Sequence, residues 1–196
     1  MDITIRLEEA EDYSYVENMT REAFWDLYKP GCNEHLIVHK LRDTPAFVKE
    51  LSLVACDKDK IVGNIIYSRA KVVNEDNTEF EVLCMGPISV LPSCQKQGIG
   101  SLLMNHSIEQ AKSLGYKAVI IWGNLNYYHR FGFTDAANYK ISPSIGENCE
   151  AFMALELYKG SLDSISGKFY EDPVFETNEE ELEAFEKQFP YKEKRV

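Results

Sequence analysis

Hydrophobic and polar positions follow two different periods near the start of the chain. Residues 2–7 alternate apolar and polar side chains, which predicts a half-buried strand. Residues 9–28 repeat apolar side chains at helical spacing, with Phe24 and Leu27 expected in the core, until Pro30-Gly31 breaks the helix. A second helix is expected over about residues 33–41.

The next part of the chain has the pattern of an antiparallel meander. Residues 51–56, 61–73 and 79–90 are rich in apolar and β-branched side chains, and short polar turns separate them. Gly86-Pro87 interrupts the third of these strands. Because proline donates no ladder hydrogen bond, we expect the strand to bulge or splay there.

A glycine turn inside residues 90–114 is the most informative stretch of the sequence. An apolar run ends in Gln95-Lys96-Gln97-Gly98-Ile99-Gly100, which opens directly into a helix that Gly115 is expected to end. Glycines let a ligand approach the main chain, and the first turn of a helix offers N–H groups to phosphate. The turn does not fit the Walker A or Rossmann patterns. An ordinary strand–turn–helix with no ligand remains the alternative.

The remainder of the chain predicts one more parallel strand, a short helix and a tail. Residues 116–122 are expected to lie parallel to residues 85–91, joined by the crossover helix. A short helix should cover residues 127–130, and residues 151–157 should form the last strand. In the tail, Thr177-Asn178-Glu179-Glu180 has the form of a capping box, so we expect an amphipathic helix that packs on the body or on a partner subunit. A substrate lid is the alternative for this helix.

Composition limits the classes of function. The chain has 196 residues, 44% of them hydrophobic, which suits one sizeable domain. A net charge of −11 argues against binding to nucleic acid or acidic membranes and favours a cationic acceptor. The five cysteines are odd in number and form no CxxC pair, which fits a reducing cytoplasm. We expect no secretory signal and no membrane span, because no apolar run approaches about 18 residues.

The string Gln-x-x-Gly-x-Gly follows a strand, and about thirty residues later residues 127–133 place Tyr128 four positions before Gly132-Phe133. The string Met85-Gly86-Pro87-Ile88-Ser89-Val90 precedes both. The first two strings resemble the two motifs of the GNAT acyltransferase superfamily, the first of which holds the pyrophosphate of acetyl-coenzyme A, and with the third they look most like its YhbS-like branch. The resemblance implies a mixed α/β GNAT fold: a central, mostly antiparallel mixed sheet, with splayed parallel strands at the cofactor cleft and helices on its faces. It also implies a transferase domain at residues 1–158 and a C-terminal extension at residues 159–196.

The resemblance further implies an N-acetyltransferase that uses acetyl-CoA as cosubstrate and no metal. A primary amine of a small molecule or a peptide would attack the thioester directly. The Ile88 N–H would polarise the acetyl carbonyl, and Tyr128 would protonate the departing thiolate. A phenol with a pKa of about 10 is a competent donor. The expected cofactor contacts are Ile88, Ser89, Val90, Gln95, Lys96, Gln97, Gly98, Ile99, Gly100, Ser101, Asn124, Asn126 and Tyr128. A GNAT-like module that senses acetyl-CoA without transferring it is the alternative.

The general base is not apparent in the sequence. Some GNAT enzymes carry a glutamate eleven residues before the first glutamine of the motif, and this chain has Cys84 there. Glu22, Glu81 or a water chain could replace it, and a strand thiol is expected to be a core residue.

The histidines offer no clear alternative chemistry. His129 is expected on the surface, and His35 with His39 lacks a third zinc ligand. By resemblance, the acceptor side of the cleft would be lined by Glu22, Trp25, Tyr28 and His35. A homodimer is plausible.

Overall fold

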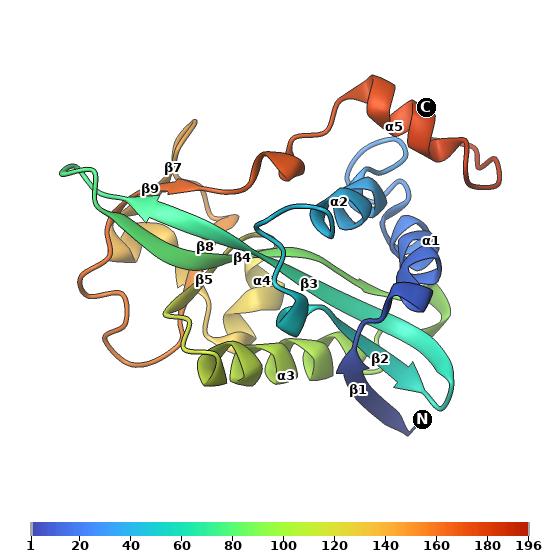
Figure 1. The fold of residues 1–196 in the computed structure, drawn as a ribbon, viewed down its shortest axis with the longest axis horizontal. Helices are drawn as coiled ribbons and strands as arrows, with labels where there is room; N and C mark the ends of the chain where they lie inside the picture. The colour runs from blue at the N-terminus through green and yellow to red at the C-terminus, as the bar shows by residue number, and fades with distance from the viewer. Residues whose placement is uncertain (1, 196) are drawn as a thin grey trace. The chain divides into compact units, whose positions relative to one another are not determined.

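The computed structural model describes residues 2–195 and divides the chain into two compact units. The first unit contains Met1–Ile66, Gly86–Met104 and Pro173–Val196, and the second contains Tyr67–Met85 and Asn105–Asp172. Three long elements run through both units (Figure 1): β3 (Lys60–Val73), β4 (Glu79–Val90) and α3 (Ile99–Ser113). The sequence prediction of each of these three elements is confirmed to within two residues.

The first unit begins with a strand, two helices and a second strand, and it also contains the C-terminal helix. Its other elements are β1 (Ile3–Leu7), α1 (Tyr13–Phe24), α2 (Glu34–Leu41), β2 (Leu53–Asp57) and α5 (Glu179–Glu186), with short 3-10 turns at Ala10–Asp12, Lys49–Leu51, Pro92–Cys94 and Pro173–Phe175. β1 pairs antiparallel with β2, and β2 pairs antiparallel with β3. The apolar faces of α1 and α2 bury Val16, Met19, Val38 and Leu41 against these strands in one cluster.

The second unit contains the parallel strand pair and the short strands that follow it. Its elements are β5 (Ala118–Trp122), α4 (Leu125–Tyr128), β6 (Thr134–Asp135), β7 (Ile141–Pro143), β8 (Phe152–Glu156) and β9 (Gly167–Tyr170), with 3-10 turns at His129–Phe131 and Ala136–Tyr139. β4 and β5 are parallel, as predicted, and β5 pairs antiparallel with β8. The strand order β1-β2-β3-β4-β5-β8-β6 makes a mixed sheet, with β9 attached to β3 and β7. A mixed α/β fold with a central sheet and flanking helices is therefore confirmed.

Three details differ from the sequence prediction. Residues 151–157 do not hold the last strand, because β9 follows and pairs with β3 through Lys71↔Tyr170, Val72↔Phe169 and Val73↔Lys168. The sequence conceals β9 because it is short and starts at Gly167 (φ +129°), where any Cβ would overlap the Val73 carbonyl. The helix cap also lies one residue later than predicted. Asn178, not Thr177, caps α5 by accepting from the Glu181 N–H at 2.8 Å. Finally, Leu27 is 57% exposed because α1 ends at Phe24 and Leu27 falls in the loop.

Candidate functional site

The glycine turn lies in the first unit and is open to solvent. Lys96 and Gly98 both take left-handed backbone angles, with φ of +61° and +86°. A Cβ placed on Gly98 would meet nothing within 4 Å, so this face of the backbone is uncovered within the described chain. The two left-handed residues turn the chain sharply from β4 into α3, and they leave its main chain accessible to a ligand.

The first turn of α3 presents N–H groups that the described protein atoms leave without an acceptor. The helix begins at Ile99, and the first donor with a helical partner is the Leu102 N–H, which bonds the Gly98 carbonyl at 3.0 Å. Across residues 2–195 no acceptor is found for the N–H groups of Ile99, Gly100 and Ser101. These donors and the positive end of the helix dipole suit an anion.

The core fixes the position of this helix start. Ile99 is only 1% exposed, so its side chain is buried in the core. Gly63 on β3 makes room for it, because a Cβ at Gly63 would lie 3.1 Å from Ile99 Cγ2, Leu103 Cδ1 and the Ser89 carbonyl. Close packing against a strand glycine therefore holds the donors in place.

Several predicted contact residues around the turn use their side chains in hydrogen bonds within the protein. The Gln95 side-chain amide donates to the Val90 carbonyl at 3.2 Å, and that of Gln97 donates to the Ser93 carbonyl at 3.4 Å. Ser89 is 2% exposed, and its hydroxyl donates to Asn64 Oδ1 at 2.6 Å. Lys96 is exposed at the turn. The turn is thus braced by two glutamines, and Lys96 is its exposed cation.

Tyr128 lies in the second unit, at the end of α4. The Asn124 side chain caps this helix by accepting from the Asn126 N–H at 2.9 Å, while Asn126 itself is exposed. The Asn124 amide oxygen therefore has a partner within the protein. The predicted contact of Asn124 or Asn126 with pantetheine remains a prediction.

The Tyr128 ring is held by aromatic neighbours and by a glycine. The residue is 9% exposed, and its ring meets the rings of Tyr127 and Phe133 edge-on, with centroids 5.0 and 5.7 Å away. A Cβ on Gly123 would overlap the Tyr128 ring at Cε2, so only glycine leaves space for the ring there. The phenol therefore sits on a firmly packed ring, while the neighbouring His129 is exposed, as predicted.

His35 is a core residue of the first unit, not an exposed wall of an acceptor site. Its side chain is 0% exposed, with Nε2 2.7 Å from Glu186 Oε1 and Nδ1 3.5 Å from the Cys32 sulfur. Burial lowers the pKa of His35 to about 4; nearby Glu186 opposes this shift and Arg21 adds to it.

In the described residues 2–195, no three His, Cys, Asp or Glu side chains are grouped as metal ligands.

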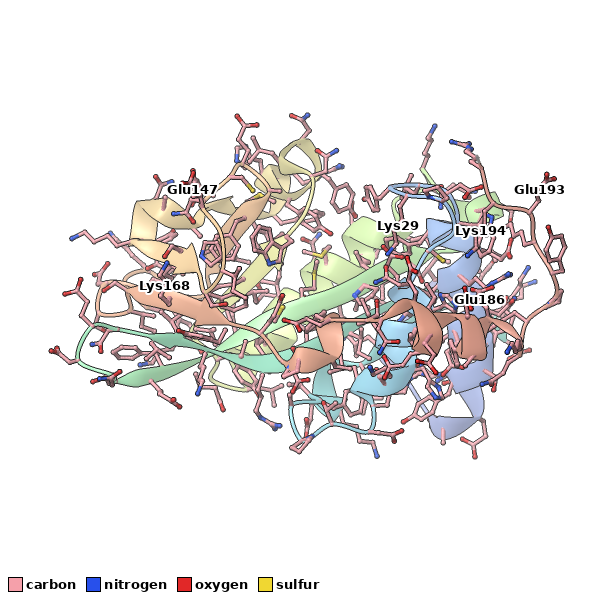
Figure 2. All side chains as sticks on the ribbon, turned by 90° about the horizontal axis from the view of Figure 1, so that it is seen from above. Lys29, Glu147, Lys168, Glu186, Glu193 and Lys194 are labelled. Carbon is pink, nitrogen blue, oxygen red and sulfur yellow. The ribbon has the colours of Figure 1, made fainter. Side chains whose placement is uncertain are left out.

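The C-terminal segment engages the other predicted acceptor-side residues. Arg21 pairs with Glu186 at 2.8 Å and Lys192 with Glu22 at 2.6 Å, and the Trp25 indole donates to the Glu193 carbonyl at 2.9 Å. Figure 2 shows Glu193 and Lys194 beside the loop that carries Lys29, after Glu186 on α5. Only Tyr28, at 74% exposure, is fully presented to solvent. The sequence could not show these contacts, because they join residues far apart in the chain.

The predicted base candidate Glu81 and a second carboxylate, Glu171, both lie in the second unit. Glu81 lines a surface depression with Glu79, Phe80, Gly115, Tyr116 and Lys117, which contains none of the predicted cofactor contacts. Glu171, which the sequence did not suggest, accepts from the Cys84 thiol at 3.8 Å.

No helix within residues 2–195 has both the length and the apolar character needed to cross a membrane.

Comparison with known proteins gives a consistent family signal. The model of the acetyltransferase (GNAT) family matches residues 17–133. The chain is 35% identical over 95 residues to the uncharacterized N-acetyltransferase YjhQ of Escherichia coli, a match that covers 48% of this chain and about half (51%) of YjhQ. It is 28% identical over 135 residues to the uncharacterized N-acetyltransferase YhbS of Escherichia coli, covering 68% of this chain and 78% of YhbS.

Solved structures share the fold. The crystal structure of Escherichia coli YhbS in complex with CoA aligns with a TM-score of 0.78 at 24% identity, covering 88% of this chain and 91% of that one. A GNAT family acetyltransferase from Brucella melitensis in complex with acetyl-CoA aligns with a TM-score of 0.72 at 27% identity, covering 89% and 98% of the two chains.

Proposed function

Because the chain belongs to the acetyltransferase (GNAT) family, we propose that it transfers an acetyl group from acetyl-CoA to a primary amine. The observation that carries this proposal is the exposed turn at Gly98, followed by three N–H groups for which residues 2–195 supply no acceptor. The coenzyme's pyrophosphate is an anion of the kind that such a helix start binds. CoA and acetyl-CoA in the two aligned crystal structures support this choice of ligand.

The binding residues divide into main-chain and side-chain contributors. We propose that the N–H groups of Gly98, Ile99, Gly100 and Ser101 hold the pyrophosphate and that Lys96 adds a positive charge. Gln95 and Gln97 shape the turn through their hydrogen bonds to the main chain. Val90, Ser89 and Ile88 would follow the pantetheine arm with their backbone, since the Ser89 side chain is already bonded to Asn64. Asn124 and Asn126 would complete the arm's contacts.

The proposed chemistry needs one donor at the carbonyl and one at the sulfur. Bound acetyl-CoA supplies a thioester whose carbonyl carbon accepts the amine. The Ile88 N–H would stabilise negative charge on the acetyl oxygen, and Tyr128 would give its phenolic proton to the leaving thiolate. The packed ring of Tyr128 supports this role, because a general acid must be held in one orientation.

The same proposal covers the organisation and location of the chain. Residues 1–158 would form the transferase domain. Residues 159–196 would form an extension that adds β9 to the edge of β3 and packs α5 beside α2. Four of the five cysteines are buried free thiols, which supports a reducing, cytoplasmic location.

A module that senses acetyl-CoA without transferring it is the second candidate, favoured by the absence of a glutamate at Cys84. Acceptor-dependent release of CoA separates the two. We would incubate the protein with acetyl-CoA and each of L-lysine, spermidine, an aminoglycoside and a peptide with a free N-terminus, and follow free thiol. Release that requires one of these amines supports the transferase. Binding of acetyl-CoA with no release above hydrolysis for any amine supports the sensor.

A further inference from the structure

A carboxylate from near the end of the chain reaches the strand position where the expected glutamate is missing. The thiol of Cys84 on β4 donates to Glu171 Oε2 at 3.8 Å, and both residues belong to the second unit. Glu171 directly follows β9 and is exposed, whereas Cys84 is 2% exposed. The pair therefore puts a carboxylate with access to solvent against the strand position that the sequence left without one.

The chemistry of this pair assigns the reactive role to the carboxylate. Burial raises the pKa of the Cys84 thiol well above its usual range, and the negative charge of Glu171 raises it further. A thiol that stays protonated is a donor and a poor nucleophile. Cys84 is therefore a donor with two acceptors in reach, Glu171 Oε2 at 3.8 Å and the Met85 carbonyl at 3.9 Å, and does not carry an acyl group itself.

The place of the contact in the sheet is also distinctive. β4 and β5 pair in parallel at Leu83↔Val119 and Cys84↔Ile120, and across the described residues no further pairing of these two strands follows Cys84. β5 nevertheless remains paired with β8 as far as Trp122. Glu171 thus contacts β4 at the last residue that pairs with β5.

A buried hydroxyl near the same thiol marks the place as polar. Ser68 on β3 is 0% exposed, and within residues 2–195 its Oγ has no hydrogen-bond partner of good geometry. It nevertheless lies close enough to Cys84 to influence the pKa of the thiol. The Ser68 hydroxyl and the Glu171 carboxylate therefore act on the Cys84 thiol in opposite directions, because the hydroxyl lowers its pKa and the carboxylate raises it.

The two carboxylates suggested by the sequence are less suitable bases. Glu22 belongs to the first unit, where its carboxylate pairs with Lys192 at 2.6 Å and Arg21 at 3.5 Å. Glu81 lies in the separate surface depression with Lys117.

We propose that Glu171 is the general base for the acceptor amine, an inference that rests on the proposed acetyl transfer. An alkylammonium gives one proton to the Glu171 carboxylate, and the neutral nitrogen attacks the thioester carbonyl carbon. The C–N bond forms and the C–S bond breaks. The thiolate takes the proton of Tyr128, and the second proton lost by the nitrogen restores Tyr128. Glu171 then releases its proton to solvent, so the net products are an amide, CoA and one proton.

The test compares Glu171→Gln with Glu176→Gln, a matched change at an exposed glutamate of the same segment. The acceptor is whichever amine of the panel supports CoA release by the parent protein. Glu171→Gln should lower kcat by about 100-fold or more at neutral pH, the usual effect of losing a general base. Its acetyl-CoA affinity and unfolding midpoint should stay at parent values, and Glu176→Gln should behave as the parent.

Chemical rescue separates a base from a structural residue. Glu171→Ala should regain activity as sodium formate is added, because a small carboxylate can take the missing proton, and Glu176→Ala should not respond. Parent-like turnover in Glu171→Gln would overturn this inference and leave the proposed function intact. A loss of activity that formate does not restore, together with a lower unfolding midpoint, would also overturn it, because Glu171 would then be a structural residue. A parent protein that releases no CoA with any amine would overturn the proposed function, and this inference with it.

Discussion

The two compact units offer a ligand different kinds of groups. In the first unit, no acceptor among residues 2–195 is found for the main-chain N–H groups of Ile99, Gly100 and Ser101, while the side chains of Arg42, Glu8 and Glu17 are buried in ion pairs at 2.6 Å. In the second unit the candidate groups are side chains that exchange protons, Tyr128 and Glu171. The buried charged side chains of the first unit are paired with one another, so its candidate ligand groups are backbone N–H groups and the exposed Lys96.

The largest expected effect concerns the second unit. Tyr128→Phe removes the phenolic oxygen but keeps the ring that packs against Tyr127 and Phe133. We expect turnover to fall about 100-fold or more, because the thiolate loses its proton donor, while affinity for acetyl-CoA stays unchanged. Steady-state kinetics and calorimetric titration measure the two quantities. Tyr127→Phe is the matched control and should keep parent-like turnover; unchanged turnover in Tyr128→Phe would remove Tyr128 from this role.

An intermediate effect concerns a charged cluster of the first unit. His35 has a pKa of about 4 in the folded protein, against an ordinary value of about 6.5. Between these two values the unfolded chain binds more protons than the folded one, so the free energy of unfolding falls as the pH drops from 6.5 to 4. The groups that face His35 are Glu186 on α5, Arg21 on α1 and Cys32.

The free energy of unfolding should fall by about 3 kcal/mol in total between pH 6.5 and 4, because a shift of one pKa unit corresponds to roughly 1.4 kcal/mol. Denaturant titrations at several pH values would measure it. His35→Gln should flatten the curve in this window, whereas His129→Gln, at an exposed site, should leave it as in the parent. A parent curve that is flat between pH 6.5 and 4 would show that His35 is not buried in its neutral form.

A smaller effect compares the two ends of α3. Gly98 and Gly115 share a φ of +86°, and a Cβ on either would meet nothing within 4 Å. Alanine at each position should therefore cost a similar amount of stability, about 1 kcal/mol. Only Gly98→Ala should also weaken acetyl-CoA binding, by about tenfold, because its methyl group narrows the approach to the main chain. Equal affinities in the two variants would argue against phosphate binding at this turn.

The sequence predicted the features that depend on local pattern. The meander, the glycine turn and the start of α3 follow from alternation and from glycine chemistry within a few residues. Family resemblance added acetyl-CoA and Tyr128, which residue types alone would not have identified.

The features that the sequence did not predict depend on contacts between distant parts of the chain. Glu171 and Cys84 are 87 residues apart, so no local pattern links them. His35 is a core residue because Phe185 and Glu186 of α5 cover it, which the spacing around His35 cannot show. The cap of α5 was misplaced because Thr177 instead accepts from the Asn33 side chain at 2.7 Å. Local sequence preferences therefore predict helices and strands, whereas the environment of a side chain depends on residues that are distant in the sequence.

The most direct test of the central claim is thermal unfolding of the parent protein and of Gly100→Glu with and without excess acetyl-CoA. At about 100 times its dissociation constant the ligand should add roughly 2.7 kcal/mol to the parent and raise its midpoint, while ATP and NAD should not. Gly100→Glu puts a negative charge in the first turn of α3, which a helix tolerates, so we expect a parent-like midpoint alone and no shift with acetyl-CoA. A parent protein that shows no shift, or a variant that shifts as the parent does, would contradict acetyl-CoA binding at the start of α3.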